Sequence, residues 1–436
     1  MGSSGLQWAT GGSTVTSRAS EVQRVDGDQR ELLGLLESVL RYARHREYTG
    51  WDYTDGMSSR IRRALPFDNR WVNLCFQETA KRAPINVRRL LLIEQRRNFK
   101  GTALFAMANL TAARQSRTLD SEAVLLAPDA YEREARELLD WLVEHRRPGY
   151  SGFCGGHEHE IQGLNGRGEI EEADVVSTVY PVRALLDGEK LDSRYAEIAC
   201  TGADFLIEDL NYRAVDGGAR IDYYESHPDD CYTINAGALA ATLLLDVYDR
   251  TGEEDLLFRA RQILDHVASL QTDLGGWYYR DPPSSSHLSM DNHHNGFIIE
   301  CFQRYHDVAE PRYEGTIDRA LSFYRDVLFE ESGAPNWDED SAYPRDIHAS
   351  AQGILVFSYA GEYEFARRIL DWTLEHLYAG EGRFYFRKHR FYTKRITLMR
   401  WCQAWMAYAI SEHIAERYGG GGVGRRIHRD QRTLGI

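Results

Sequence analysis

The stretch DNHHNGFIIE, residues 291–300, begins a predicted helix that continues through residue 305. Its first turn is polar and the remainder is apolar nearly all round, so the helix should be buried with only its N-terminus among polar groups. GGWYY at 275–279 precedes it, and an amphipathic helix over 254–271 comes before that segment. The local unit is therefore an amphipathic helix, a Gly-aromatic segment and a buried helix.

This unit recurs along the chain, and a recurring helix pair indicates a repeat architecture. The other apolar helices are predicted to begin near Lys100, Asp174, Tyr232, Asp346 and Arg395. The amphipathic helices are predicted over 30–46, 131–146, 193–209, 254–271, 313–330 and 363–378. Six wet outer helices around six buried inner ones predict an all-α (α/α)6 toroid, a six-hairpin barrel forming a single domain over residues 27–418. An open solenoid of stacked helix pairs is the alternative.

The two ends differ in composition from this repeat. Residues 1–26 and 419–436 are rich in Gly and Ser or in charge, so we expect a disordered N-terminal segment and a flexible tail. We find no signal-peptide core and no apolar run that approaches a membrane span. Six dispersed cysteines without a CxxC pair indicate buried thiols in a reducing compartment. A cytoplasmic location is the expectation.

The charge excludes one class of partner. A formal net charge of −14 repels nucleic acid from most of the surface. Only five of the 52 basic residues are lysines, and acidity with little lysine favours a halophilic source. A GC-rich genome that favours arginine codons is the alternative.

Polar residues collect at the first turns of the predicted inner helices and in the loops that lead to them. In a toroid these turns open at one end and would line one polar cup, in which aromatic rings, carboxylates and arginines suit a sugar. The expected substrate-binding residues are Trp51, Asp52, Asp55, Lys100, His157, His159, Tyr224, Tyr232, Asn235, Trp277, His293, Asn295, Arg345, Gln352, Arg395 and Arg400. Of these, Lys100, Arg345, Arg395 and Arg400 are expected to bind a carboxylate or phosphate of the substrate.

Simpler explanations stay open for several of these residues. Asp174, Asp291 and Asp346 are good helix N-caps, and Trp277 could belong to the core. The histidines near residues 157, 293 and 348 could bind a metal, but adjacent histidines point in different directions on a helix and no HExxH motif accompanies them. We therefore expect no metal and no cofactor.

Several segments resemble a known family: GWDYTDGMSSR (50–60), RAPINVRRLL (82–91), NFKGTALF (98–105), DNHHNGFIIE (291–300) and DIHASAQG (346–353). They are similar to a family of toroid proteins encoded among enzymes of polysaccharide and archaeal N-glycan assembly. The resemblance implies a sugar isomerisation step in glycan assembly, on a free, lipid-linked or nucleotide-linked sugar or glycan. The implied fold is also that of N-acylglucosamine 2-epimerases and unsaturated glucuronyl hydrolases, but no catalytic motif of either matches residue by residue.

Three functions remain open from the sequence. An epimerase or isomerase of a hexuronic acid or related sugar needs two proton-transfer groups with pKa values near neutrality, and His294 and His348 are the expected pair. A glycoside hydrolase or lyase would instead use two carboxylates, with Asp291, Asp346 and Asp174 as candidates. A non-catalytic glycan-binding protein is the third possibility, disfavoured because buried acid-base groups are costly to hold without use.

Overall fold

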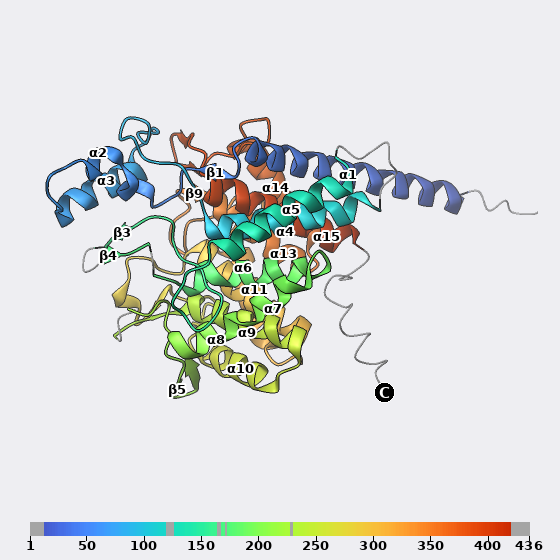
Figure 1. The fold of residues 1–436 in the computed structure, drawn as a ribbon. Helices are drawn as coiled ribbons and strands as arrows, with labels where there is room; N and C mark the ends of the chain where they lie inside the picture. Colours follow the sequence, from blue (N-terminus) through green and yellow to red (C-terminus); the bar gives the residue numbers. More distant parts are fainter. Residues whose placement is uncertain (1–12, 119–125, 164–166, 171, 227–229, 420–436) are drawn as a thin grey trace, which may run out of the picture.

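The computed structural model describes residues 13–118, 126–163, 167–170, 172–226 and 230–419 (Figure 1). The described chain is mainly helical, and its strands are two or three residues long. None of the helices in these ranges combines the length and apolar composition needed to cross a membrane. Residues 1–12 and 420–436, which make up most of the predicted unstructured ends, lie outside the described residues. The first helix begins at Ser13.

Six buried helices form an inner ring. They are α4 (Phe99–Ser116), α6 (Val175–Asp187), α9 (Ile234–Thr251), α11 (Asn292–Val308), α13 (Ile347–Tyr359) and α15 (Trp405–Tyr418). Each contacts the next in this order, and α15 contacts α4. The ring is therefore closed, which confirms the toroid and rules out the open solenoid.

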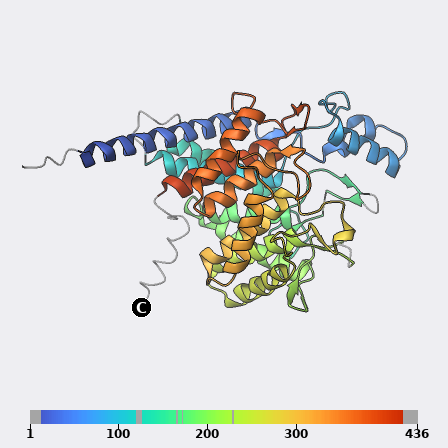
Figure 2. The same cartoon turned by 180° about the vertical axis from the view of Figure 1, so that it is seen from behind.

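Six outer helices cover this ring. They are α1 (Ser13–Arg44), α5 (Pro128–Glu144), α7 (Ser193–Cys200), α10 (Glu254–Ser269), α12 (Glu314–Asp326) and α14 (Tyr363–Leu377). Each packs on one inner helix: α1 on α15, α5 on α4, α7 on α6, α10 on α9, α12 on α11 and α14 on α13. Figure 1 shows α5, α6 and α7 in front, and Figure 2 shows the last repeats, in orange and red, on the opposite side.

Two predicted helices differ in detail from the structure. The outer helix expected over 193–209 is broken after α7, where α8 (Gly202–Asp204) and the π-helical η4 (Phe205–Asp209) follow. The last inner helix was expected to begin near Arg395, but its first turn, the π-helical η6 (Met399–Ala404), begins four residues later. Thr393–Lys394 forms strand β11, which pairs with β10 (Arg387–Lys388), and this pairing keeps the preceding backbone extended.

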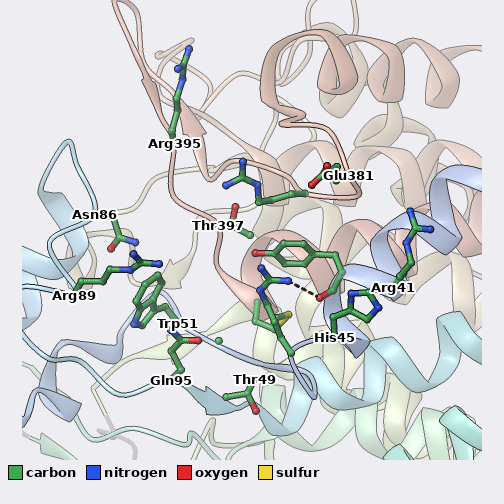
Figure 3. A pocket seen from close by; sticks show the side chains of 15 residues that line it. Arg41, His45, Thr49, Trp51, Asn86, Arg89, Gln95, Glu381, Arg395 and Thr397 are labelled. Atoms are coloured by element: carbon green, nitrogen blue, oxygen red, sulfur yellow. Dashed lines mark hydrogen bonds between the residues drawn. The ribbon is translucent and has the colours of Figure 1, made fainter.

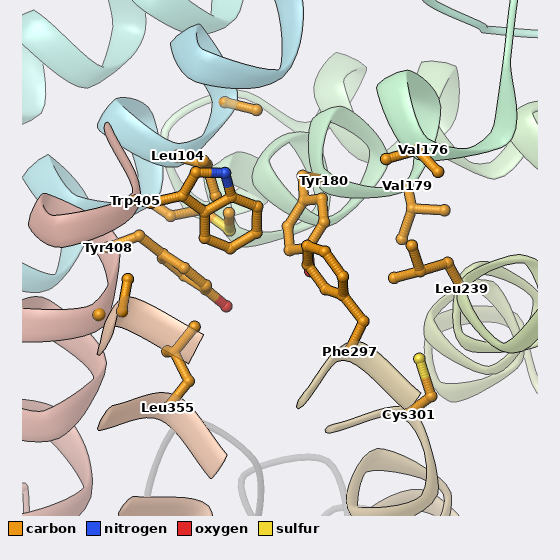
Figure 4. Close-up of a cluster of buried hydrophobic side chains, with 14 of the residues drawn as sticks. Leu104, Val176, Val179, Tyr180, Leu239, Phe297, Cys301, Leu355, Trp405 and Tyr408 are labelled. Carbon is orange, nitrogen blue, oxygen red and sulfur yellow. The ribbon is translucent and has the colours of Figure 1, made fainter. Parts of the chain in front are cut away.

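Large side chains fill the axis of the ring. Figure 4 shows Leu104, Tyr180, Leu239, Phe297 and Leu355 meeting, together with Trp405 and Tyr408, so that all six inner helices contribute to one apolar cluster. The ring of Tyr180 meets that of Trp405 edge-on, with 5.0 Å between centroids. Because these side chains are buried and closely packed, a substrate has to approach from one end of the ring.

The repeated glycines of the Gly-aromatic segments serve a common turn. Gly217, Gly275, Gly333 and Gly382 all have φ between +73° and +98°, a conformation that glycine adopts without steric cost. At Gly382, an added Cβ would also lie 2.0 Å from the Ser38 carbonyl oxygen of α1. These glycines therefore fix how each outer helix returns to the next inner one, and they carry no chemistry.

The strands connect the loops at the polar end of the ring. Their pairs are β1 (Thr49–Gly50) with β2 (Arg96–Arg97), β3 (Ile161–Gln162) with β4 (Arg167–Gly168), β5 (Arg213–Val215) with β6 (Gly218–Arg220), β7 (Tyr232–Thr233) with β8 (Arg280–Asp281), and β10 with β9 (Arg345–Asp346) and β11. Between β1 and β2, a small helical lobe stands away from the ring and includes the 3-10 turn η1 (Asp55–Ser58) (Figure 1). The lobe contains α2 (Arg60–Arg63) and α3 (Arg70–Arg82), which lie outside the predicted helix pairs. Two further 3-10 turns, η3 (Gly188–Lys190) and η5 (Pro283–Ser285), lie elsewhere in the chain.

Candidate active site

The N-termini of four inner helices carry side-chain caps. Asn98, Asp174, Asp291 and Asp346 each accept a hydrogen bond from a backbone N–H of the first turn of α4, α6, α11 and α13, respectively. The capping explanation is therefore correct for all three aspartates. In each aspartate, one carboxylate oxygen accepts the capping hydrogen bond. The other oxygen lies among the histidines, lysine and arginine described below.

Asp291 holds two histidines of α11. His294 Nδ1 lies 2.7 Å from Asp291 Oδ2, and His293 Nδ1 lies 3.0 Å from Asp291 Oδ1. Burial alone would raise the pKa of Asp291, but the two histidines hold it well below its usual value. The carboxylate therefore accepts the Nδ1 proton of His294, which leaves Nε2 as the basic nitrogen. The His294 side chain keeps 17% of its surface exposed, in contrast to the 1% of Asp291.

Asp346 is fully engaged in protein contacts. Its Oδ1 accepts hydrogen bonds from the His348 backbone N–H and from Trp401 Nε1, each at 2.8 Å, and its Oδ2 pairs with Arg387. The residue is only 1% exposed. Asp346 therefore joins α13 to η6 and to β10, and it has no free oxygen for a substrate.

His348 lies below His293, among aromatic rings. Its ring is 4.9 Å from that of His293, 4.6 Å from that of Trp401 and 4.5 Å from that of Trp405, measured between centroids. Burial, followed by nearby positive charge, places its pKa well below the usual value. Both ring nitrogens are enclosed and have no hydrogen-bond partner among the described residues. His348 is thus a neutral side chain beneath the site.

Lys100 projects from the first turn of α4 as an unpaired cation. In the described part of the chain, no residue forms a hydrogen bond or an ion pair with its Nζ, which lies 5.9 Å from the centre of the Trp405 ring. Burial, reinforced by the charge of Arg400, lowers the pKa of Lys100 to about 7. Burial is the main cause of the lowered pKa of His294, and the charges of His293 and Lys100 lower it further. Lys100 and His294 therefore face one polar region.

Arg400 and Asp52 neutralise each other beside Lys100. Arg400 donates from Nε and Nη2 to the Asp52 carboxylate at 2.7–3.1 Å, and Asn98 Nδ2 donates to the same carboxylate at 3.0 Å. Burial opposes ionisation of Asp52, but Arg400 holds its pKa far below the usual value. The pair ties the loop after β1 to the last inner helix, so both residues have a structural role at the site.

Asp174 and two histidines form the wall beside α6. Asp174 Oδ2 is buried without a hydrogen bond among the described residues, and His157 Nε2 lies 3.8 Å from it. His157 keeps 35% of its side chain exposed, whereas His159 is buried, and burial lowers its pKa to about 4. Asp174 also affects the pKa of Lys100, so this wall belongs to the same polar region. We call this region the polar centre: Asp52, Lys100, His157, His159, Asp174, Asp291, His293, His294, His348 and Arg400.

Other predicted site residues have structural contacts instead. Trp277 is 1% exposed, stacks on Phe302 and donates from Nε1 to the Val267 carbonyl, so the core explanation applies. Asn295 bonds both the backbone N–H and the carbonyl of Trp277 and thereby fixes that loop. Gln352 donates to Glu300 between α13 and α11.

The remaining predicted residues lie around the edge of the polar centre or away from it. Asp55 pairs with Arg88 inside the lobe, and burial raises its pKa to about 6 despite that pairing. Tyr232 packs against Arg220 and His266, and Arg345 pairs with Glu330. Asn235 is buried in the first turn of α9, and Tyr224 lies beside Tyr223. Trp51 and Arg395 line a separate pocket, which is described below.

The structure adds four residues to the surroundings of the site. Arg387 and Trp401 hold Asp346, and the ring centroid of Tyr279 lies 4.4 Å from that of His294. Burial, followed by the charge of Asp174, raises the pKa of Tyr223. Tyr279 ends the segment GGWYY, and Arg387 directly follows GRFYF, so both sit at the ends of recognised repeats. Their position at the ends of these repeats is the feature of the sequence by which they could have been selected as site residues.

One group could hold a metal ion. Asp291, His293 and His294 offer ligand atoms that all lie within 4.8 Å of one another. Two of these separations are hydrogen-bond distances between Nδ1 and a carboxylate oxygen, which accounts for the clustering without an ion. A metal would have to replace both hydrogen bonds.

A second polar feature is a pocket of about 810 Å³ outside the ring (Figure 3). It lies between the end of α1, the segment at β1, the loop near residue 89 and the loop from 381 to 399. Its charged residues are Arg41, Arg46, Arg89, Arg383, Arg395 and Glu381, and Trp51 forms one wall. Met399 N donates to the Trp51 carbonyl at 2.9 Å, so the residues next to Asp52 and Arg400 separate this pocket from the polar centre.

Comparisons with known proteins establish the fold. No family model and no curated protein matches the chain. Among solved structures, a cellobiose 2-epimerase from Bacillus thermoamylovorans matches with a TM-score of 0.55 at 13% identity, over 73% of this chain and 87% of that one. A D-mannose isomerase matches with a TM-score of 0.52 at 10% identity, over 73% and 87%. A GH76 α-mannanase from Bacteroides thetaiotaomicron gives 0.53 at 12%, over 78% and 88%. The chain thus has the (α/α)6 toroid fold that sugar isomerases, sugar epimerases and glycoside hydrolases share.

Proposed function

We propose that this chain is a sugar isomerase or epimerase that moves a proton at a carbon beside a carbonyl or carboxylate. The observation that carries the proposal is the pair of His294 and Asp291: a partly exposed imidazole whose Nδ1 is held by a carboxylate, so that Nε2 is a neutral base near pH 7. A sugar isomerase and a sugar epimerase are among the solved structures whose fold is similar to that of this chain.

Lys100 is our candidate for the second proton-transfer group. The helices α4 and α11 are three places apart in the six-membered inner ring, so Lys100 and His294 approach the axis from opposite sides. A pKa of about 7 suits a group that gives and takes a proton near neutrality. His348 is the second group predicted from the sequence, but its enclosed ring nitrogens favour Lys100 instead.

The proposed mechanism needs no cofactor. Neutral His294 takes the proton from one face of the sugar carbon, and the Asp291 carboxylate stabilises the imidazolium that forms. The Lys100 ammonium returns a proton to the opposite face, or to a neighbouring carbon in an isomerisation. In the reverse direction the two groups exchange roles.

The biological setting belongs to the same proposal. The segments that resemble toroid proteins of polysaccharide and archaeal N-glycan assembly, such as the archaeal glycosylation protein AglQ, suggest a hexuronic acid or related sugar as substrate. We place this step in the cytoplasm, on a free, lipid-linked or nucleotide-linked sugar or glycan.

A glycoside hydrolase or lyase is the second candidate. The observation in its favour is Asp174, whose Oδ2 has no partner among the described residues and could act on a glycosidic bond. Against it, Asp346 has no free oxygen, and Asp291 is held ionised by two histidines, which prevents it from acting as a general acid. A purely glycan-binding role would leave the depressed pKa of Lys100 without a use.

An assay for two products separates these candidates. Hexuronic acids and uronate-containing oligosaccharides are incubated with the protein, and sugar isomers and new reducing ends are both quantified. We expect isomer interconversion without new reducing ends, and Asp174→Asn should reduce it only modestly. Release of reducing ends that Asp174→Asn abolishes would instead establish the hydrolase, and neither product with any of these sugars would speak for a binding protein.

The pH dependence tests Lys100 separately. For the isomer whose proton His294 removes, kcat/KM should fall as pH rises through about 7, because the neutral amine cannot donate. Lys100→Gln should lower kcat/KM by about 10²-fold or more and remove that decline. The exposed Lys190→Gln serves as the matched control and should keep the wild-type profile. A decline that persists in Lys100→Gln would assign the pKa to another group.

A further inference from the structure

The pocket outside the ring is unusually basic for an acidic protein. Arg41, Arg46, Arg89, Arg383 and Arg395 line it with a single carboxylate, Glu381, while the chain as a whole carries a formal charge of −14. Across the part of the chain that the structure describes, none of these five arginines forms an ion pair. Arg41, Arg46, Arg89 and Arg395 are exposed, and Arg383 is half-buried. Exposed arginines elsewhere do form ion pairs, as at Arg60, Arg82 and Arg194.

Structural roles explain only part of this arrangement. Arg41 belongs to the last turn of α1, where a cation interacts favourably with the helix dipole, and Arg46 donates to the Tyr42 carbonyl at 3.2 Å and lies over its ring. Arg89 and Arg395 come from separate loops and have only longer ring contacts, 5.8 Å from the ring centre of Trp51 and 5.9 Å from that of Tyr385. Figure 3 shows Arg89 next to Trp51, Arg41 on the opposite side and Arg395 above them, with the guanidinium groups of Arg41 and Arg395 directed away from the middle of the group. Because most of these guanidinium groups are exposed, water screens their mutual repulsion and leaves them available to an anion that enters the pocket.

We propose that this arginine pocket binds a diphosphate group. Guanidinium groups bind phosphate oxygens through paired hydrogen bonds. The pocket has five arginines and one carboxylate, Glu381, and this excess of positive charge matches the charge of a diphosphate better than that of a single uronate. The volume of about 810 Å³ lies in the range of pockets for small ligands, and Trp51, with Arg89 5.8 Å from its ring centre, offers a flat wall for the group attached to the phosphates. Nucleic acid is disfavoured by the acidic remainder of the surface.

The pocket adjoins the polar centre. Trp51 and Met399 line the pocket, and the next residues, Asp52 and Arg400, form the ion pair of the polar centre. If the proposed isomerase function is correct, the diphosphate would belong to the carrier of the sugar, either a nucleoside diphosphate or a lipid diphosphate. The anion site itself does not depend on that function.

The test is direct binding without turnover. Isothermal titration with inorganic pyrophosphate should give one saturable site whose affinity falls with added salt. The double variant Arg41→Gln/Arg89→Gln should weaken binding at least about tenfold, and Arg395→Gln should act in the same direction. Arg368→Gln, an exposed arginine of α14 outside the pocket, is the matched control and should bind as the wild type does.

Three further arms define the ligand. UDP and farnesyl diphosphate represent the two carriers, and the one that binds more tightly than pyrophosphate identifies the source. D-Glucuronate represents a carboxylate alone and should bind much more weakly. Absence of saturable pyrophosphate binding, or equal affinity in the double variant and the wild type, would overturn the site. If neither carrier binds more tightly than pyrophosphate, or if glucuronate binds equally well, the diphosphate-carrier assignment is wrong.

This experiment can fail independently of the proposed function. His294→Gln should abolish isomer conversion and leave pyrophosphate binding unchanged. Conversely, the arginine variants should leave proton exchange on a free sugar unchanged. The two proposals are therefore tested by different measurements on the same folded chain.

Discussion

Replacing His294 with glutamine is expected to lower kcat for isomer conversion by about 10²- to 10⁴-fold, the usual contribution of a positioned acid-base group. Glutamine keeps a polar side chain next to Asp291 but has no basic nitrogen. The loss should therefore appear in kcat, with a small change in KM and in melting temperature. Steady-state kinetics and thermal unfolding of the same preparation measure both.

The matched control lies on the same helix. His306 is an exposed histidine of α11 outside the polar centre, and His306→Gln should retain wild-type kcat. His348→Gln is the informative comparison, because the sequence alone favoured it as the second base. We expect it to alter stability more than the proton-transfer step, and a loss of kcat as large as that of His294→Gln, at unchanged melting temperature, would return the second role to His348.

Asp52→Asn should produce the largest effect on stability. The substitution leaves Arg400 buried without its counter-ion, and breaking such a pair costs about 3–5 kcal/mol in free energy of unfolding. The pair joins residues 348 positions apart in the chain, so its loss loosens the contact between the first loop and the last inner helix. Urea unfolding measures the change.

A surface pair provides the control for Asp52. Asp255 and Arg259 form an exposed i,i+4 pair on α10, and Asp255→Asn should change the free energy of unfolding by no more than about 1 kcal/mol. If Asp52→Asn instead leaves stability unchanged and raises only KM, Asp52 and Arg400 contact the substrate, as the sequence analysis expected, and our structural assignment of the pair is wrong.

The fold was predictable because the spacing of apolar residues along the chain shows which helices are buried and which have one exposed face. Six apolar helices alternating with six amphipathic ones require an inner and an outer ring, and the positions near Asp174, Tyr232, Asp291 and Asp346 locate the inner helices to within a few residues. The exceptions have local causes. Strand pairing at Thr393–Lys394 delays the last inner helix, and α3 belongs to a lobe outside the repeat.

The site was predictable in composition but not in pairing. The polar first turns do bring Lys100, Asp174, His294 and their neighbours together. The sequence could not show that Arg400 forms an ion pair with Asp52, or that Arg387 forms one with Asp346, because these partners lie far apart in the chain. Such pairings decide which charges remain available to a substrate. Of the four cations predicted to bind an anionic group of the substrate, Arg345 and Arg400 are paired with carboxylates, and Lys100 and Arg395 are not, within the part of the chain that the structure describes.

The central claim is proton transfer at a carbon of the sugar, and solvent isotope incorporation tests it most directly. The wild-type protein is incubated with the candidate uronic acids in D₂O, and each sugar is analysed by NMR and mass spectrometry. We predict one deuterium at a carbon beside the carbonyl or carboxyl group, with interconversion of two isomers. Lys100→Gln should retain exchange from one isomer while net conversion falls by about 10²-fold or more, because His294 still acts alone. Cleaved products without carbon-bound deuterium would contradict the account.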